Sequence, residues 1–92
     1  AHFRFAPAFP NPFSHSAELR FTLSRESDVS LKVFGVRGRL IADLAGERLP
    51  AGSHRRTWNG TNTRGESAPM GIYFARLEAD GVTAVQRIVF VP

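Results

Sequence analysis

The chain has 92 residues, a formal net charge of +4 and no cysteine. A chain of this length builds one small domain with one core, and without cysteine it has neither disulfides nor a thiolate metal site. No apolar run is long enough to cross a bilayer, and no charged-then-apolar stretch typical of a signal peptide stands at the start. Eight phenylalanines, one tyrosine and one tryptophan supply the aromatic area that such a core needs.

Arginine dominates the basic residues, because the chain has eleven arginines and a single lysine. A nucleic-acid site calls for a basic stripe interleaved with aromatic residues, whereas only Arg55 and Arg56 are adjacent here. We therefore expect no nucleic-acid partner, and we expect most guanidinium groups to lie in water. The arginines are Arg4, Arg20, Arg25, Arg37, Arg39, Arg48, Arg55, Arg56, Arg64, Arg76 and Arg87.

Residues His2 to Ala6 alternate like a strand, with Phe3 and Phe5 on one side, and we count a possible extra strand over His2 to Ala8. Three prolines follow closely and hinder smooth continuation into the next strand. We predict an extended apolar arm over residues 1–9 and an Ig-like β-sandwich domain over residues 10–92. The arm either folds back on its own domain or adds to a sheet edge of a neighbouring copy. Exchange between copies would be head-to-tail and would propagate into a filament.

Alternation of apolar and polar residues predicts strands at 17–23 and 29–33. The polar connection 24–28 has the length of a hairpin loop, so we predict that these two strands pair. Residues 35–38 form a turn with two glycines available for positive φ. The run 39–44 has mixed apolar spacing and fits either a strand or a single helical turn.

The second half begins with a predicted turn at residues 49–52 and a strand at residues 53–58. Trp58 ends that strand, and we predict that it is the large central aromatic of the core. The loop 59–65 is polar and resembles a calcium loop without its carboxylates, which a hard cation prefers. Asn59 begins a glycan-acceptor pattern, so its modification depends on the source of the protein.

Two long strands, 72–79 and 82–91, surround Asp80-Gly81. This dipeptide between alternating apolar runs is among the strongest short-range signals of a type I′ hairpin, because both central positions need positive φ. We therefore predict positive φ at Gly81. In total the pattern predicts an all-β fold, an Ig-like or fibronectin-like antiparallel β-sandwich of about seven strands.

Candidate chemistry is sparse. The three histidines, His2, His15 and His54, have no partner at a metal-ligand spacing, and no two carboxylates suggest acid–base work. For His54 we predict a hydrogen-bonding role beside Trp58. Ser53 cannot use the adjacent histidine as a base, because neighbouring strand residues point to opposite faces. We therefore predict a protein that is not an enzyme, with no catalytic residue, metal or cofactor.

A series of short motifs in a fixed order covers about 75 residues of the chain. In this order they resemble the C-terminal secretion and sorting domain of the type IX system, a close relative of the Ig-like domain of the flagellar hook-capping protein. The motifs are Pro10-Asn11-Pro12-Phe13, Leu19-x-Phe21-x-Leu23, Val29-x-Leu31-x-Val33-Phe34, Gly38-Arg39, Leu49-Pro50-Ala51-Gly52-x-His54, Trp58-Asn59-Gly60 with Gly65, Gly71-Ile72-Tyr73-Phe74, Arg76-Leu77 and the final strand with Arg87.

The resemblance implies a secreted or cell-surface β-sandwich that acts by being recognised or by packing. Its partners would be protein components of a secretion machinery, in the role of a sorting and surface-attachment domain. The alternative is a structural protein, a subunit that assembles with copies of itself into a filament by strand exchange. The residues that we predict for interaction are Phe3, Phe5, Pro10, Asn11, Pro12, Phe13 and Arg87, and those for structure are Trp58, Gly60, Gly71, Tyr73 and Gly81.

Overall fold

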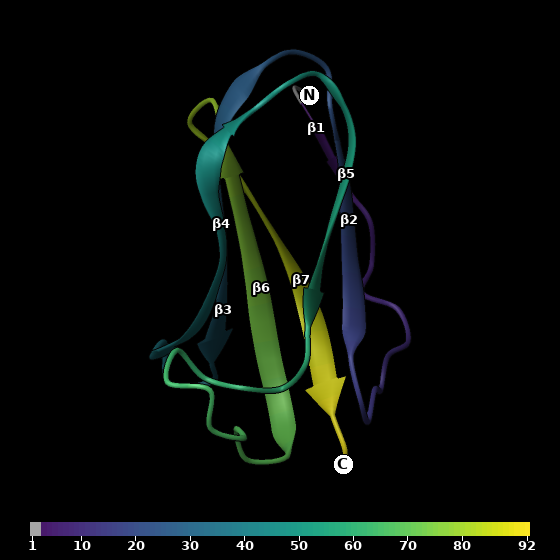
Figure 1. The fold of residues 1–92 in the computed structure, drawn as a ribbon, viewed down its shortest axis with the longest axis vertical. Coiled ribbons are helices and arrows are strands. Elements are labelled where there is room, and N and C mark those ends of the chain that lie inside the picture. The colour runs from purple at the N-terminus through teal and green to yellow at the C-terminus, as the bar shows by residue number, and fades with distance from the viewer. Residues whose placement is uncertain (1–2) are drawn as a thin grey trace.

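Seven strands in two antiparallel sheets make up the fold of residues 3–92, the part of the chain that the computed structural model describes (Figure 1). One sheet has the order β1-β2-β5 and the other the order β4-β3-β6-β7, which confirms the predicted all-β sandwich. None of the described residues forms a helix long and apolar enough to span a membrane. The strands are β1 (Phe3–Phe5), β2 (Ala17–Leu23), β3 (Ser27–Gly35), β4 (Leu40–Leu49), β5 (Gly52–Trp58), β6 (Gly71–Ala79) and β7 (Val82–Phe90).

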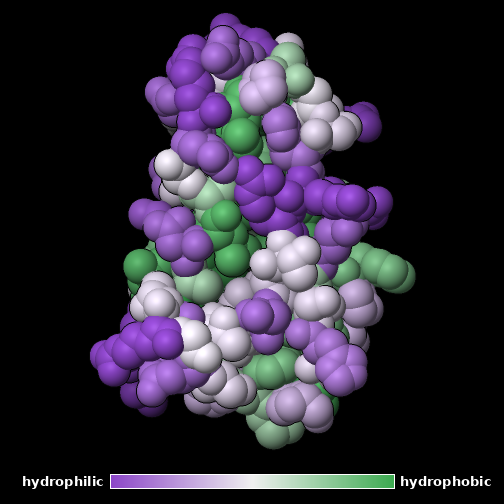
Figure 2. All heavy atoms as spheres, viewed as in Figure 1, coloured by the Kyte–Doolittle hydropathy of each residue, from purple (hydrophilic) through white to green (hydrophobic). Residues whose placement is uncertain are grey.

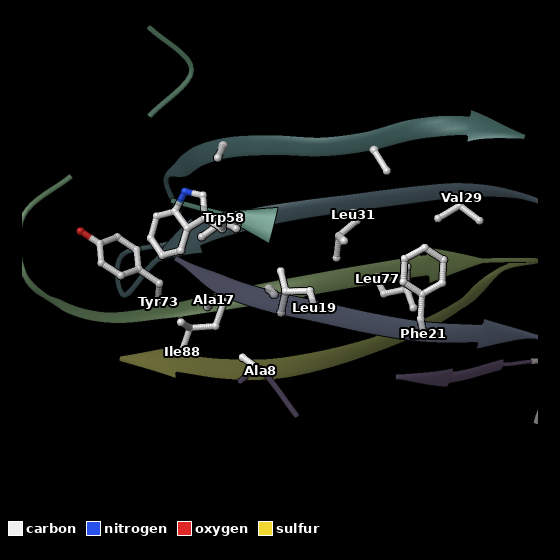
Figure 3. Packing of buried hydrophobic residues seen from close by; sticks show 14 of the residues in the cluster. Ala8, Ala17, Leu19, Phe21, Val29, Leu31, Trp58, Tyr73, Leu77 and Ile88 are labelled. Carbon is white, nitrogen blue, oxygen red and sulfur yellow. The ribbon is translucent and has the colours of Figure 1, made fainter. Parts of the chain in front are cut away.

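The core lies between the two sheets and follows directly from the alternation. In β2, every second residue from Ala17 to Leu23 is buried, because successive side chains of a strand point to opposite faces. Figure 3 shows Leu19 and Phe21 of β2 directed toward Leu31 and Leu77, which come from the opposite sheet. The inner faces of both sheets thus form one continuous apolar cluster.

The predicted hairpin between the first two long strands is wrong. β2 pairs with β1 and β5, whereas β3 pairs with β4 and β6, so residues 24–26 carry the chain from one sheet to the other. Both strands have an apolar inner face, and alternation alone cannot distinguish pairing within a sheet from packing across a core. The crossing is held at Asp80 Oδ2, which accepts from Arg25 Nε at 2.9 Å and from the buried Ser27 hydroxyl at 3.1 Å.

The run 39–44, with its mixed apolar spacing, lies almost entirely in β4. It is therefore a strand and not a helical turn. The register between β3 and β4 shifts twice, between Leu31 and Lys32 and again between Val33 and Phe34. Such irregularities insert extra residues into one strand of a pair and break strict alternation. They account for the mixed spacing in the sequence.

The hairpin between β6 and β7 has the predicted geometry. Ala79 lies opposite Val82, so two residues form the turn, and φ is 52° at Asp80 and 75° at Gly81. Positive φ at both central positions is the requirement of a type I′ turn. Gly38, with φ of 81°, closes the turn between β3 and β4 by donating its amide to the carbonyl of Gly35 at 3.0 Å.

The N-terminal segment is part of the sandwich rather than a projecting arm. Phe3–Phe5 pairs with β2, and Phe9 continues that alignment by exchanging two main-chain hydrogen bonds with Glu18. Phe3 is only 9% exposed, and Phe5 packs against the core from a half-buried position. Burial of both rings and completion of a three-stranded sheet favour this placement over an arm in water. Of the predicted strand His2 to Ala8, His2 lies outside the described residues.

Candidate interaction surfaces

The motif Pro10-Asn11-Pro12-Phe13 covers the outer edge of β7. The Asn11 side chain acts as a peptide group would, because Nδ2 donates to the carbonyl of Arg87 at 2.9 Å and Oδ1 accepts from the amide of Val89 at 2.9 Å. Phe13 continues the pairing through its main chain, donating to the Val89 carbonyl and accepting from the Val91 amide. The peptide bonds that precede Pro10 and Pro12 are both cis. An edge strand that would otherwise be open is thereby paired.

The Phe13 side chain leads from this edge into an aromatic cluster at one end of the sandwich. Its ring lies 4.8 Å from that of Phe90 and 5.4 Å from that of Trp58, measured between centroids. Trp58 in turn contacts Tyr73 edge-on at 4.9 Å, and its indole Nε1 donates to the carbonyl of Thr61 at 2.9 Å. Phe13, which was predicted for interaction, therefore lies in one cluster with Trp58 and Tyr73, which were predicted for structure.

Gly60 and Gly71 shape the loops beside that cluster. Gly60 has φ of 78° and lies against the Phe90 ring, where an added Cβ would fall 2.7 Å from Cζ. Gly71 has φ of 146° and has open space around it. Tyr73 is buried, its hydroxyl donates to the carbonyl of Pro69, and burial raises the pKa of that hydroxyl. These residues fix the connection between β5 and β6 to the core.

Side chains also protect the other sheet edges. Arg56 Nη2 lies 2.7 Å from Glu47 Oε1 and so links the edge strand β5 to the edge strand β4, while Nη1 donates to the carbonyl of Arg55. Figure 2 shows apolar atoms at the surface in the strip between β4 and β5, among hydrophilic side chains. At the opposite side, Gln86 Nε2 donates to the carbonyl of Phe5 at 2.8 Å, which caps the edge of β1. Charged and amide groups at edges oppose strand addition by other chains.

His54 does not lie beside Trp58. The prediction of a hydrogen-bonding role beside that residue is therefore wrong about the neighbouring residue. Its Nε2 is 2.7 Å from the carbonyl of Pro50, and its ring packs at 5.5 Å from that of Phe21. The two residues are four positions apart on one strand, a distance that side chains on a strand do not readily bridge. Among residues 3–92, no three histidine, aspartate or glutamate side chains cluster in a way that could hold a metal ion.

One end of the outer face of the four-stranded sheet carries a group of apolar residues. Leu40, Phe34 and Phe74 lie side by side in register across β4, β3 and β6, and the next residue of this row is Arg87 on β7. Ile72 pairs with Val89 beside this row. We call the following residues the apolar face: Phe34, Leu40, Ile72, Phe74, Val85 and Val89.

Basic side chains are interleaved with the apolar face. The guanidinium of Arg76 stacks over the Phe34 ring at 4.3 Å, and Val85 lies opposite Arg76 on β7. Ile72 is 43% and Val85 52% exposed. Of the residues on this part of the sheet, the sequence predicts only Arg87 as an interaction residue, because alternation assigns the outward positions of the strands to solvent. A detectable signal was that apolar residues occupy both parities of β6 and β7, which is typical of strands covered on both faces.

We expect Asn11→Ala to lower the free energy of unfolding by about 1–3 kcal/mol, since two hydrogen bonds are lost. It should also uncover the edge of β7 and cause association at high protein concentration. Asn62→Ala is the matched control: Asn62 Oδ1 accepts from the amides of Arg64 and Glu66, within a loop and away from any strand edge. Thermal melting and light scattering measure both effects. Equal scattering from the two variants would contradict the edge role of Asn11.

The comparison with known families concerns most of the chain. The model of the FlgD Ig-like domain matches residues 12–82. The chain belongs to the FlgD Ig-like domain family. This match confirms the resemblance to the Ig-like domain of the flagellar hook-capping protein, and a FlgD-type Ig domain is a structural module. No curated protein matches the chain.

Solved structures share the fold at low identity. Dimeric latent PorU from Porphyromonas gingivalis is 19% identical with a TM-score of 0.76, over 97% of this chain and 9% of that one. FlgD from P. aeruginosa is 24% identical with a TM-score of 0.59, over 80% and 59% of the two chains. PorZ, a surface component of the type IX secretion system of Porphyromonas gingivalis, is 16% identical with a TM-score of 0.66, over 96% and 11%. The chain thus spans between 9% and 59% of these proteins.

Proposed function

We propose that the chain is a recognition module of an exported protein, through which that protein is sorted to the cell surface or held there. The observation that carries this proposal is the apolar face on the outer side of the four-stranded sheet, where three residues are exposed and the other three are partly exposed. Soluble monomers rarely leave large contiguous apolar patches in water, and such patches mark contacts with other proteins. The proposed location is extracellular or at the cell surface.

The mode of contact follows from the protected edges. Asn11 and Phe13 cover the edge of β7, and Arg56 obstructs the edge of β5, so strand addition at these two edges is opposed. On the apolar face the guanidinium of Arg76 lies over Phe34, whereas Ile72 and Val85 stay exposed. A partner would therefore dock flat against β3, β6 and β7, with its own apolar side chains on Phe74 and its acidic groups near Arg76 and Arg87.

The relatives supply a context for this proposal. PorU and PorZ hold a domain of this fold as a small part of a much longer chain, and PorZ is named as a bacterial surface component of the type IX secretion system. A small sandwich domain within a large protein can serve as the part that other proteins of a secretion system bind. We extend that role to this chain as the sorting and attachment function.

The test uses the full-length protein that carries this domain, in the cells that produce it. The double variant Ile72→Asn/Val85→Asn removes exposed apolar groups from the apolar face, and Val82→Asn is the control because Val82 is similarly exposed beside the hairpin turn. We expect the double variant to lose surface attachment, measured as the protein in envelope and medium fractions, while the control behaves as the parent. Both variants must melt near the parent temperature. Unchanged attachment of a folded double variant would contradict the proposal.

Self-assembly by strand exchange is the second candidate. It is favoured by one observation, that β1 has three residues in the described part of the chain and occupies a sheet edge, so β1 of one copy could take its place on β2 of another. Such exchange remakes the contacts that β1 already has within the chain. Light scattering of the purified chain at high concentration decides the matter. Polymers that disappear on deletion of residues 1–8 would favour this candidate over the first.

A further inference from the structure

A pocket lies on the outer face of the three-stranded sheet, on the side of the sandwich opposite the apolar face. It gathers arginines from three strands, Arg4 of β1, Arg20 of β2 and Arg55 of β5. Arg20 and Arg55 are direct cross-strand partners, and Thr22 and Ser53 form the next pair of the same face. These five residues line the pocket. Arginines that are scattered in the sequence are thus brought together by the register of the sheet.

The charges of the pocket are poorly balanced. Like charges directly opposite each other on a sheet are destabilising, and Arg20 and Arg55 form such a pair. Glu18 offsets both, with carboxylate oxygens 3.4 Å from Arg20 Nε and 3.6 Å from Arg55 Nη1. Among the described residues no carboxylate lies within ion-pair distance of Arg4. Three guanidinium groups therefore face one carboxylate, and the pocket attracts anions.

The arrangement suits several carboxylates better than one small anion. Neighbouring strands lie about 4.8 Å apart, so three arginines on three strands extend over roughly 10 Å. One oxyanion cannot bridge that distance, whereas an extended peptide with acidic side chains on one side can. Guanidinium groups bind carboxylates in a bidentate manner, and the hydroxyls of Thr22 and Ser53 add donors.

A nucleic acid fits the pocket less well. Single strands are held by aromatic rings on which bases stack, together with a basic groove. Of the two phenylalanines that line the pocket, Phe21 is 2% exposed and Phe5 packs against the core, so their rings face inward. We propose that the pocket binds an acidic segment of a protein partner, through the carboxylates of that segment. This site is independent of the apolar face.

Binding of a labelled synthetic peptide of alternating glutamate and serine to the purified chain tests the proposal. We expect Arg4→Gln/Arg55→Gln to weaken binding about fivefold to tenfold at low salt. The matched control is Arg37→Gln/Arg64→Gln, which removes the same charge from exposed positions outside the pocket and should change the affinity less than about twofold. All substituted residues are exposed, so circular dichroism should show folded proteins.

Three results would overturn the proposal. The first is no binding of the glutamate peptide at low salt, or equal binding of the same peptide with glutamine in place of glutamate. The second is an equal loss of affinity in both double variants, which would show that net charge alone attracts the peptide. The third is tighter binding of a single-stranded oligonucleotide of equal charge that Arg4→Gln/Arg55→Gln weakens. None of these results depends on surface attachment through the apolar face.

Discussion

Trp58→Ala should lower the free energy of unfolding by about 3–5 kcal/mol, the usual cost of removing a large aromatic side chain from a core. Trp58 is 1% exposed and contacts Phe13, Tyr73 and Phe90. Its loss would leave a cavity among three rings and free the carbonyl of Thr61 from its hydrogen bond. The cluster lies where residues 10–13 meet the end of β7. The pairing of these residues with the edge of β7 should therefore loosen as well.

Chemical denaturation followed by far-ultraviolet circular dichroism measures this effect, because the variant has lost its only tryptophan. A small domain has a total stability of about 5–15 kcal/mol, so the substitution removes a large share. Trp58→Phe is the control, since it keeps a ring in the cluster and should cost less. A midpoint for Trp58→Ala within experimental error of the parent would contradict the central place of Trp58.

Gly60→Ala should cost about 2–5 kcal/mol although it adds a single methyl group. An alanine Cβ would lie 2.7, 2.9 and 3.0 Å from three atoms of the buried Phe90 ring, and the ring would have to move. The backbone adds to this cost, because φ is 78° and residues with a Cβ are strained there. Overpacking of a core typically costs about 1–3 kcal/mol, and the left-handed conformation about 1–2 kcal/mol.

Gly65→Ala separates these two contributions. Gly65 has φ of 81°, nearly that of Gly60, but nothing lies within 4 Å of the position of its Cβ. We expect Gly65→Ala to cost only the backbone part, about 1–2 kcal/mol. The difference between the two variants in thermal or chemical unfolding is then the cost of the clash with Phe90. Equal destabilisation would show that the ring can move away freely.

The strands of this fold are largely readable from the sequence, because burial on one face imposes alternation. The turn at Asp80-Gly81 was predictable for a local reason, namely that only particular residues accept positive φ at both positions. The pairing partners of β2 and β3 were not predictable in this way. β2 and β3 have the same apolar pattern whether they pair or face each other across the core, and the decisive contacts of Asp80 with Arg25 and Ser27 link distant parts of the chain.

The surfaces were harder to predict than the core. The resemblance predicts Asn11 and Phe13 as interaction residues. It does not predict that they contact β7 of the same chain. The two candidate binding surfaces depend on register, which brings Phe34 beside Phe74 and Arg20 beside Arg55. No local pattern contains that information, because it arises only once non-adjacent strands pair.

We propose above that a partner protein recognises this module at the apolar face. The most direct measurement places a photoreactive amino acid at position 72 or 85 of the full-length protein and, as a control, at position 82, followed by irradiation of the cells that produce it. We expect one and the same protein to be cross-linked from positions 72 and 85 and not from position 82. Cross-links of equal yield from all three positions, or none from the apolar face, would contradict it.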